Sequence, residues 1–245
     1  MERLKNLDFC IHYLMRQQNV QATVPPSLEG KQRLFRFLMN IWHPKPLGNE
    51  FVQAQNMELQ AQLRDKGIVQ RPGLLWQGDI TRLQVDAIVN AANSQGLGCW
   101  HPLHGCIDNA IHSAAGLQLR QECSKVLGGT EIATGGAIIT PAYNLPSRYV
   151  IHTVGPIVGP EGPTAGQQQQ LAGCYRSCLA LAQEFECRTI AFCCISTGEY
   201  NFPNRLAAEI AVKACRNSRI RVVFCVFKDI DYQIYSELLW GSSRK

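Results

Sequence analysis

The chain has 245 residues, of which 46% are hydrophobic and 18% are charged, so it holds enough apolar material for a folded core. Its formal net charge of +5 suits an anionic ligand, but the sequence has no dense Lys/Arg block and no basic–aromatic alternation, which argues against nucleic acid as a partner. No stretch approaches the roughly 20 apolar residues of a transmembrane helix, so we expect no membrane association.

The first residues, Met1 to Asn6, lead into mixed polar sequence rather than into the apolar core of a signal peptide, and we therefore expect a cytoplasmic protein. In that reducing compartment, 11 scattered cysteines, an odd number, are poor material for a disulfide framework. Most of them, such as Cys193, Cys194 and Cys225, lie in apolar runs and are expected to be small buried side chains.

Residues 1–70 predict a helical N-terminal extension. Apolar side chains recur at helical spacing over residues 7–15 and 34–41, with Pro25–Pro26 between the two segments. A polar, Gln-rich stretch at residues 50–66 predicts a third helix. Such helices supply no obvious chemistry, and we interpret them as an extension that packs on the rest of the chain or binds a partner.

Residues 71–245 predict a three-layer α/β domain with a largely parallel or mixed central sheet, because short apolar, β-branched runs alternate with helical stretches. Strands are expected at residues 74–76, 87–90, 137–140, 149–152, 190–195 and 222–227, and helices at 108–115, 168–185, 205–214 and 232–239. Ligands of such domains bind at the carboxyl ends of the strands, where loops enter helices.

Three loops at expected strand ends carry polar residues, and each has two interpretations. The loop from Ser196 to Pro203 offers hydroxyls, a glycine and free amides at a helix N-terminus, which suits phosphate oxygens, but it also fits an ordinary turn. The asparagines Asn90 and Asn93 suit ribose hydroxyls or simply a turn. Asp79 can accept a hydrogen bond from an exocyclic amino group or cap a helix.

Five segments in one order strengthen these interpretations. They are Gly78 to Thr81, Asp86 to Asn93, Ala110 to Gly116, Gly135 to Ala137 and Ile195 to Pro203. This ordered set resembles the macrodomain family, an ADP-ribose-binding α/β fold, from about residue 73 to the C-terminus. The resemblance implies that Asp79 and Ile80 bind adenine with Phe227 nearby, that Asn90 and Asn93 contact the distal ribose, and that Ser196, Thr197, Gly198, Glu199 and Tyr200 wrap the diphosphate. His112 and His152 are expected to be structural.

Cys99, His104 and Cys106 form a candidate metal site. They lie within eight residues in a loop interrupted by glycine and proline, so their side chains can converge on one ion. Two thiolates and one imidazole suit Zn²⁺ better than Mg²⁺ or Ca²⁺, and three protein ligands leave a fourth position open, as in catalytic zinc sites. His101 is a competing ligand, disfavoured by the proline that follows it, and chance placement of two cysteines beside a histidine is the alternative.

Residues 96–108 also resemble the zinc-containing subgroup of microbial macrodomains, and this resemblance extends to the helical N-terminal extension. It implies a zinc ion beside Asn93 that faces the distal ribose and either fixes a ribose hydroxyl or activates water. Asp108 matches the position of the acid in catalytic macrodomains, so Asp108 and Asn93 are the candidate catalytic residues. Favourable placement of a carboxylate at a helix N-terminus is the competing explanation for Asp108.

The resemblance implies a zinc-dependent hydrolase that removes mono-ADP-ribose from modified proteins, with Asp or Glu as the modified side chain by analogy with the subgroup. It also implies two partners, a class M sirtuin and a lipoyl-carrier protein of the glycine-cleavage H type. A reader that binds ADP-ribosylated protein without cleaving it is the main alternative. The third interpretation is a zinc-stabilised scaffold in which the N-terminal helices bind a partner and the pocket is vestigial.

Overall fold

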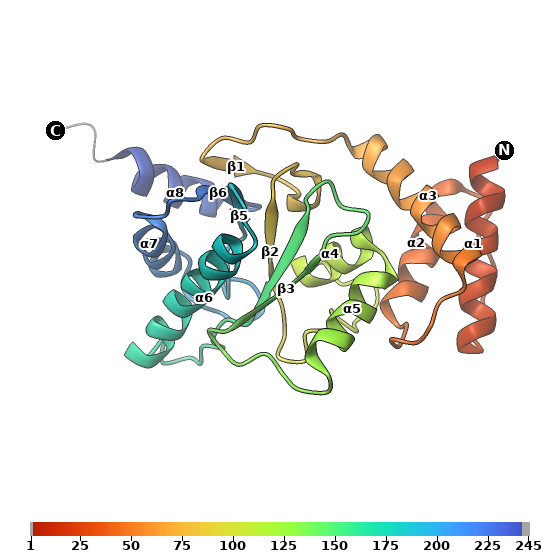
Figure 1. Cartoon of the computed structure of the whole chain (residues 1–245), viewed down its shortest axis with the longest axis horizontal. Helices are drawn as coiled ribbons and strands as arrows, with labels where there is room; N and C mark the ends of the chain where they lie inside the picture. The colour runs from red at the N-terminus through yellow and green to blue at the C-terminus, as the bar shows by residue number, and fades with distance from the viewer. Residues whose placement is uncertain (1, 242–245) are drawn as a thin grey trace.

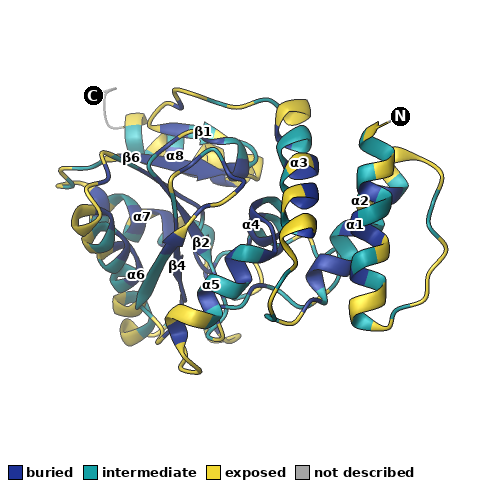
Figure 2. Ribbon diagram, turned by 45° about the vertical axis from the view of Figure 1, so that its right-hand side comes forward, coloured by how far each residue is buried: buried dark blue, intermediate teal, exposed yellow. Residues whose placement is uncertain are grey.

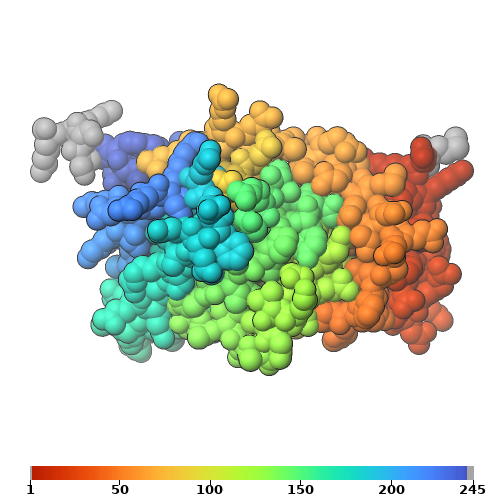
Figure 3. All heavy atoms as spheres, viewed as in Figure 1, coloured from red at the N-terminus to blue at the C-terminus, as the bar shows by residue number. Residues whose placement is uncertain are grey.

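The computed structural model describes residues 2–241, and its chain begins with three helices that lie beside the sheet (Figure 1). They are α1 (Glu2–Gln18), α2 (Leu28–Asn40) and α3 (Asn49–Lys66). The helices share a core of their own, in which Leu14, Phe35, Trp42 and Phe51 are fully buried. The hydroxyl of Ser27 accepts a hydrogen bond from the amide of Gly30 and so fixes the start of α2. The space-filling view places these helices at one end of the long axis (Figure 3).

The central sheet has six strands and is mixed. In chain order the strands are β1 (Leu75–Gln77), β2 (Ala87–Ala91), β3 (Ala137–Pro141), β4 (Tyr149–Thr153), β5 (Thr189–Phe192) and β6 (Arg221–Val226). Their order in space is β1-β6-β5-β2-β4-β3, and only β3 runs antiparallel, against β4. β2 lies in the middle and is buried along nearly its whole length, as expected for a parallel strand that is covered on both faces.

Helices cover both faces of this sheet (Figure 1). They are α4 (Ile107–Ala115), α5 (Leu117–Leu127), α6 (Ala165–Glu184), α7 (Asn204–Cys215) and α8 (Asp229–Trp240), with the short 3-10 helix η1 (Ile80–Arg82) after β1. α4 and α5 pack on one side, whereas α6, α7 and α8 pack on the other. The buried residues form a continuous band through the sheet and the inner helix faces (Figure 2).

The expected fold class is confirmed, since a helical segment precedes a three-layer α/β domain with a mixed sheet. α5 was not expected, because it follows α4 after the single residue Gly116. The division between residues 70 and 71 stays a prediction; α3 ends at Lys66, and Val69 forms an isolated bridge with Leu83. Within residues 2–241, no helix has both the length and the apolarity needed to cross a membrane.

Candidate active site and metal centre

A cleft of about 950 Å³ opens where the parallel strands end. β1 leads to Asp79, β2 to Asn93, β5 to Ser196 and β6 to Phe227, so four loops far apart in the sequence meet at one edge of the sheet. The predicted site residues that line this cleft are Asp79, Ile80, Asn93, Cys99, His104, Cys106, Asp108, Ser196, Thr197, Gly198, Glu199, Tyr200 and Phe227. Asn90 is the exception, because it is fully buried behind the cleft wall.

The loop after β5 turns sharply at Ser196, which has a positive φ of 67°. The Ser196 hydroxyl is buried in the cleft wall and has no hydrogen-bond partner among the residues that the structure describes. Gly155 lies directly against it, since a Cβ at that position would come within 1.9 Å of the Ser196 Oγ. A buried donor without a protein partner beside a permissive backbone can receive a polar ligand atom.

Another part of the cleft lining is formed by the residues expected to bind adenine. The Asp79 Oδ1 accepts hydrogen bonds from the amide of Thr81 at 3.0 Å and from its hydroxyl at 2.6 Å, and the Oδ2 lies 3.3 Å from the Lys66 Nζ. Burial opposes ionisation of this carboxyl, but the Thr81 hydrogen bonds and the Lys66 charge outweigh it and lower its pKa. Phe227 is 76% exposed and lines the cleft.

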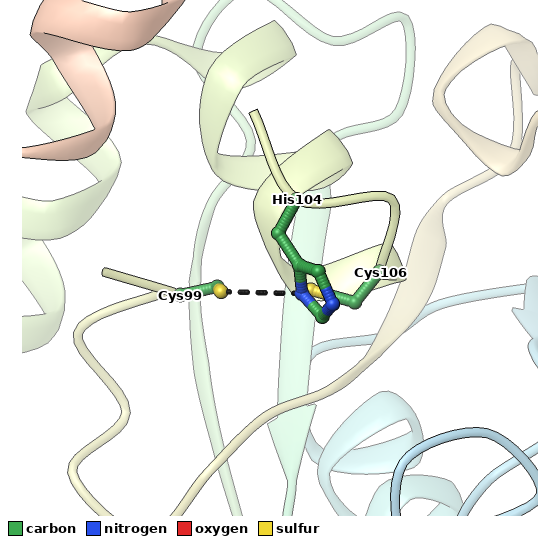
Figure 4. A group of neighbouring side chains, drawn as sticks. All are labelled: Cys99, His104 and Cys106. Atoms are coloured by element: carbon green, nitrogen blue, oxygen red, sulfur yellow. Dashed lines mark hydrogen bonds between the residues drawn. The ribbon is translucent and has the colours of Figure 1, made fainter. Parts of the chain in front are cut away.

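The three metal-ligand candidates converge in the lining of the cleft, on the loop formed by residues 99–106, here called the Cys–His loop (Figure 4). The Cys99 Sγ lies 3.6 Å from the His104 Nδ1, and all three ligand atoms lie within 4.8 Å of one another. Tetrahedral zinc with bonds of about 2.3 Å to sulfur and 2.0 Å to nitrogen separates such a pair by about 3.5 Å. The three side chains therefore fit a zinc ion.

The surroundings of the three ligands also fit a metal. The other ring nitrogen of His104, Nε2, lies 3.6 Å from the Glu199 Oε1, and metal-binding histidines commonly give their second N–H to a carboxylate. Cys106 is the N-cap of α4, and its Sγ accepts from the Asn109 amide at 3.4 Å. Burial raises the pKa of the Cys106 thiol to about 12, so its thiolate requires a neighbouring cation.

Asp108 sits in the first turn of α4 and is held by Asn90. The Asn90 Nδ2 donates to the Asp108 Oδ1 at 2.7 Å, and the same nitrogen lies 3.1 Å from the His152 Nδ1. Because an amide nitrogen only donates, His152 accepts at Nδ1 and its Nε2 faces the Thr140 hydroxyl at 3.1 Å. Burial raises the pKa of Asp108 to about 6, although the Asn90 hydrogen bond and the Arg120 charge oppose this shift.

Asn93 connects the end of β2 to the Cys–His loop. Its Oδ1 accepts from the Gly96 amide at 3.2 Å, and its Nδ2 donates to the Gly98 carbonyl at 3.3 Å. Gly98 has a φ of 84° and a Cβ there would come within 2.8 Å of the His112 ring, so this turn accepts only glycine. His112 is buried below the loop, consistent with the structural role expected for it.

The helical extension lines the same cleft, which sequence reasoning missed. Arg33, Arg36, Gln62 and Lys66 of α2 and α3 all contribute to its wall. No motif marks these residues, because their place in the cleft follows from how the extension packs on α4 rather than from their own sequence pattern. The extension, interpreted from the sequence as a packing or partner-binding segment, therefore also borders the cleft.

Comparison with known proteins agrees with this architecture. The family model described as Macro domain matches residues 89–211. A protein of Treponema medium named Protein-ADP-ribose hydrolase is 46% identical, over 94% of this chain and 97% of the relative. The solved Oceanobacillus iheyensis macrodomain with ADP is 39% identical, with a TM-score of 0.61 over 70% of this chain and 92% of that one. The Trypanosoma brucei macrodomain in complex with ADP-ribose is 29% identical, with a TM-score of 0.61 over 89% and 97% of the two chains.

Proposed function

Since this chain belongs to the Macro domain family, we propose that it is a zinc-dependent hydrolase that removes mono-ADP-ribose from modified proteins. The observation that carries the proposal is the convergence of Cys99, His104 and Cys106 in the wall of the cleft that also contains Asp108. The name of the Treponema medium relative, which matches nearly the whole chain, supports hydrolysis of a protein-linked ADP-ribose.

In this proposal the nucleotide spans the cleft from end to end. Asp79, Ile80 and Phe227 bind the adenine, the loop from Ser196 to Tyr200 wraps the diphosphate, and Asn93 contacts the distal ribose. The buried, unpartnered Ser196 hydroxyl supports the placement of phosphate oxygens at that loop. Asn90 serves the same end of the cleft indirectly, by orienting Asp108.

Chemistry takes place where the distal ribose meets the modified side chain. Cys99, His104 and Cys106 would hold the zinc, which would either fix the position of a ribose hydroxyl or activate water by lowering its pKa to about 7. Asp108 orients the attacking water or holds a ribose hydroxyl, and its fixed contact with Asn90 keeps its carboxylate in one position. The cleaved bond is the one at the anomeric carbon.

The physiological setting rests on the resemblance to zinc-containing macrodomains. We propose an ester linkage to Asp or Glu, made by a class M sirtuin on a lipoyl-carrier protein of the glycine-cleavage H type. The cytoplasm is the proposed compartment, and the 11 cysteines, all free within residues 2–241, are compatible with a reducing environment.

A reader without activity is the second candidate, since the cleft alone suffices to bind ADP-ribose. The metal-ligand cluster and the buried Asp108 favour the hydrolase, because a reader needs neither.

A scaffold with a vestigial cleft is the third candidate. In that case excess ADP-ribose would leave the melting temperature unchanged, whereas a true ligand at about 100 times its Kd stabilises the folded state by about 2.7 kcal/mol.

The deciding experiment follows release of free ADP-ribose from two mono-ADP-ribosylated proteins, one linked through Asp or Glu and one through Ser, with and without a zinc chelator. We expect release from the first substrate, loss of release with chelator, and recovery on adding Zn²⁺. Binding without release over long incubation would favour the reader. Full activity in metal-free protein would remove zinc from the proposal.

A further inference from the structure

The Cys–His loop has little structure of its own. Between residues 99 and 105, its backbone makes one hydrogen bond with itself, from the His104 amide to the His101 carbonyl at 3.3 Å. A loop with so few internal bonds is costly to order, because each fixed residue loses backbone entropy. Something outside the loop must therefore hold the three ligand side chains in their converged arrangement.

Arg36 of α2 supplies one such contact from outside the loop. Its Nη2 donates to the carbonyl of His104, one of the three candidate ligands, at 3.0 Å. The same guanidinium donates to the Asn109 Oδ1 from Nη2 at 2.7 Å and from Nε at 3.1 Å. Asn109 in turn donates from its side-chain Nδ2 to the His101 carbonyl at 3.0 Å, and its backbone amide donates to the Cys106 Sγ. One arginine thus fixes the loop at both its middle and its end.

A second contact from the same helix reaches the residue before His104. The Asn40 Oδ1 accepts from the Leu103 amide at 2.9 Å, and its Nδ2 donates to the Ser113 hydroxyl at 3.0 Å. Leu103 has a positive φ of 57°, a conformation that a leucine adopts only where its surroundings impose it. Asn40 is buried, so this contact is shielded from water.

We propose that Arg36 is a positioning residue of the metal centre: through Asn109 and the His104 carbonyl it holds the Cys–His loop, so that the helical extension forms an outer shell of the active site. This inference rests on the proposed metal-dependent function. Mutation of a residue that orients a metal ligand from outside typically costs about 10- to 100-fold in metal affinity or activity. The planar fork of arginine suits the role, because it reaches two acceptors at fixed geometry.

The test measures two properties of the full chain in the wild type, Arg36→Ala and Arg36→Lys. Zinc affinity is measured by competition with a colorimetric chelator, and hydrogen exchange of the Cys–His loop is measured in metal-free protein. We expect Arg36→Ala to weaken zinc binding by 10- to 100-fold and to speed exchange of the loop by roughly fivefold or more. Arg36→Lys keeps the charge but not the fork, so its zinc affinity is expected between the two.

Arg16→Ala is the matched control, because Arg16 is an exposed arginine on α1 of the same extension; it should match the wild type in both measurements. Zinc affinity unchanged in folded Arg36→Ala, or fully restored by Arg36→Lys, would overturn the inference. A wild type that binds no zinc would refute the metal in the proposed function instead. In that case hydrogen exchange in metal-free protein tests the role of Arg36 by itself. A Cys–His loop that exchanges equally slowly in Arg36→Ala and in the wild type would overturn the positioning role.

Discussion

Asn90, at the end of β2, donates a hydrogen bond of 2.7 Å to the carboxylate of Asp108 in the first turn of α4. The bond joins the central strand to the helix that follows the Cys–His loop, and it points one carboxylate oxygen away from solvent. Asp108 is only 5% exposed, yet it lines the cleft. The hydrogen bond from Asn90 therefore holds the buried Asp108 carboxylate in one position.

Asp108→Asn should lower turnover by about 10²- to 10⁴-fold, because the amide keeps the shape and can still accept from Asn90 but cannot act as a base. ADP-ribose affinity, measured by calorimetry, should change by a few-fold at most. The matched control is Asp229→Asn, which also removes a first-turn carboxylate from a helix but lies outside the cleft lining. Equal activity of the two variants would leave Asp108 with a purely helix-stabilising role.

Cys99→Ser and His104→Ala should each abolish stoichiometric zinc binding and hydrolysis together, because two remaining ligands cannot hold the ion. His101→Ala should keep both, since the structure brings only Cys99, His104 and Cys106 together as a cluster in this loop within the described residues, and the His101 side chain is exposed. Zinc content by elemental analysis and release of ADP-ribose provide the measurements. Loss of zinc in His101→Ala would mean a fourth protein ligand and no open position.

Gly155→Ala should distort the loop from Ser196 to Tyr200, which we propose binds the diphosphate, because the new methyl group would come within 1.9 Å of the Ser196 hydroxyl. Forcing this contact apart costs about 1–3 kcal/mol, and we expect a roughly tenfold rise in the Kd for ADP-ribose. Gly159→Ala is the control in the same segment, since nothing lies within 4 Å of its added Cβ. Unchanged affinity in Gly155→Ala would separate Ser196 from ligand binding.

His152 makes the fold sensitive to acid. Burial lowers its pKa to about 3, whereas an unfolded histidine titrates near 6.5. Between these pH values the unfolded chain binds a proton at His152 that the folded chain does not. The contribution of His152 to the free energy of unfolding is therefore intact above about pH 6.5 and falls as the pH drops. Between pH 7 and pH 5, the free energy of unfolding should fall by about 2 kcal/mol less in the His152→Gln variant than in the wild type. Urea unfolding with chelator present measures this difference, and parallel pH profiles would refute it.

Much of the fold was readable from the sequence because buried parallel strands and amphipathic helices leave simple patterns. The expected strand at residues 190–195 shows the limit, since β5 ends at Phe192 while the apolar run continues into the cleft wall. An apolar pattern cannot distinguish a strand from a buried loop. α5 was missed for two reasons: only Gly116 separates it from α4, and its inner face includes the buried charged residue Arg120, which interrupts the apolar spacing.

Some residues of the candidate site could likewise be predicted from the sequence, and others could not. Cys99, His104 and Cys106 were found because their ligand atoms come from one short segment, and the structure brings them together. Arg36 and Asn109 are 73 residues apart, and neither belongs to a recognisable motif. Their contact depends on how the extension docks on α4, which only the folded chain defines.

Gln55 of α3 shows how closely the two parts of the chain are joined. Its buried Oε1 accepts from the amide of Leu117 at 2.9 Å, at the start of α5, and the Leu117 side chain is buried in the core of the three N-terminal helices. A truncated chain that began after α3 would lose the acceptor of this amide and expose the Leu117 side chain to solvent. We expect such a chain to aggregate and to unfold locally at the start of α5, so a loss of its activity would not report on the chemistry of the cleft.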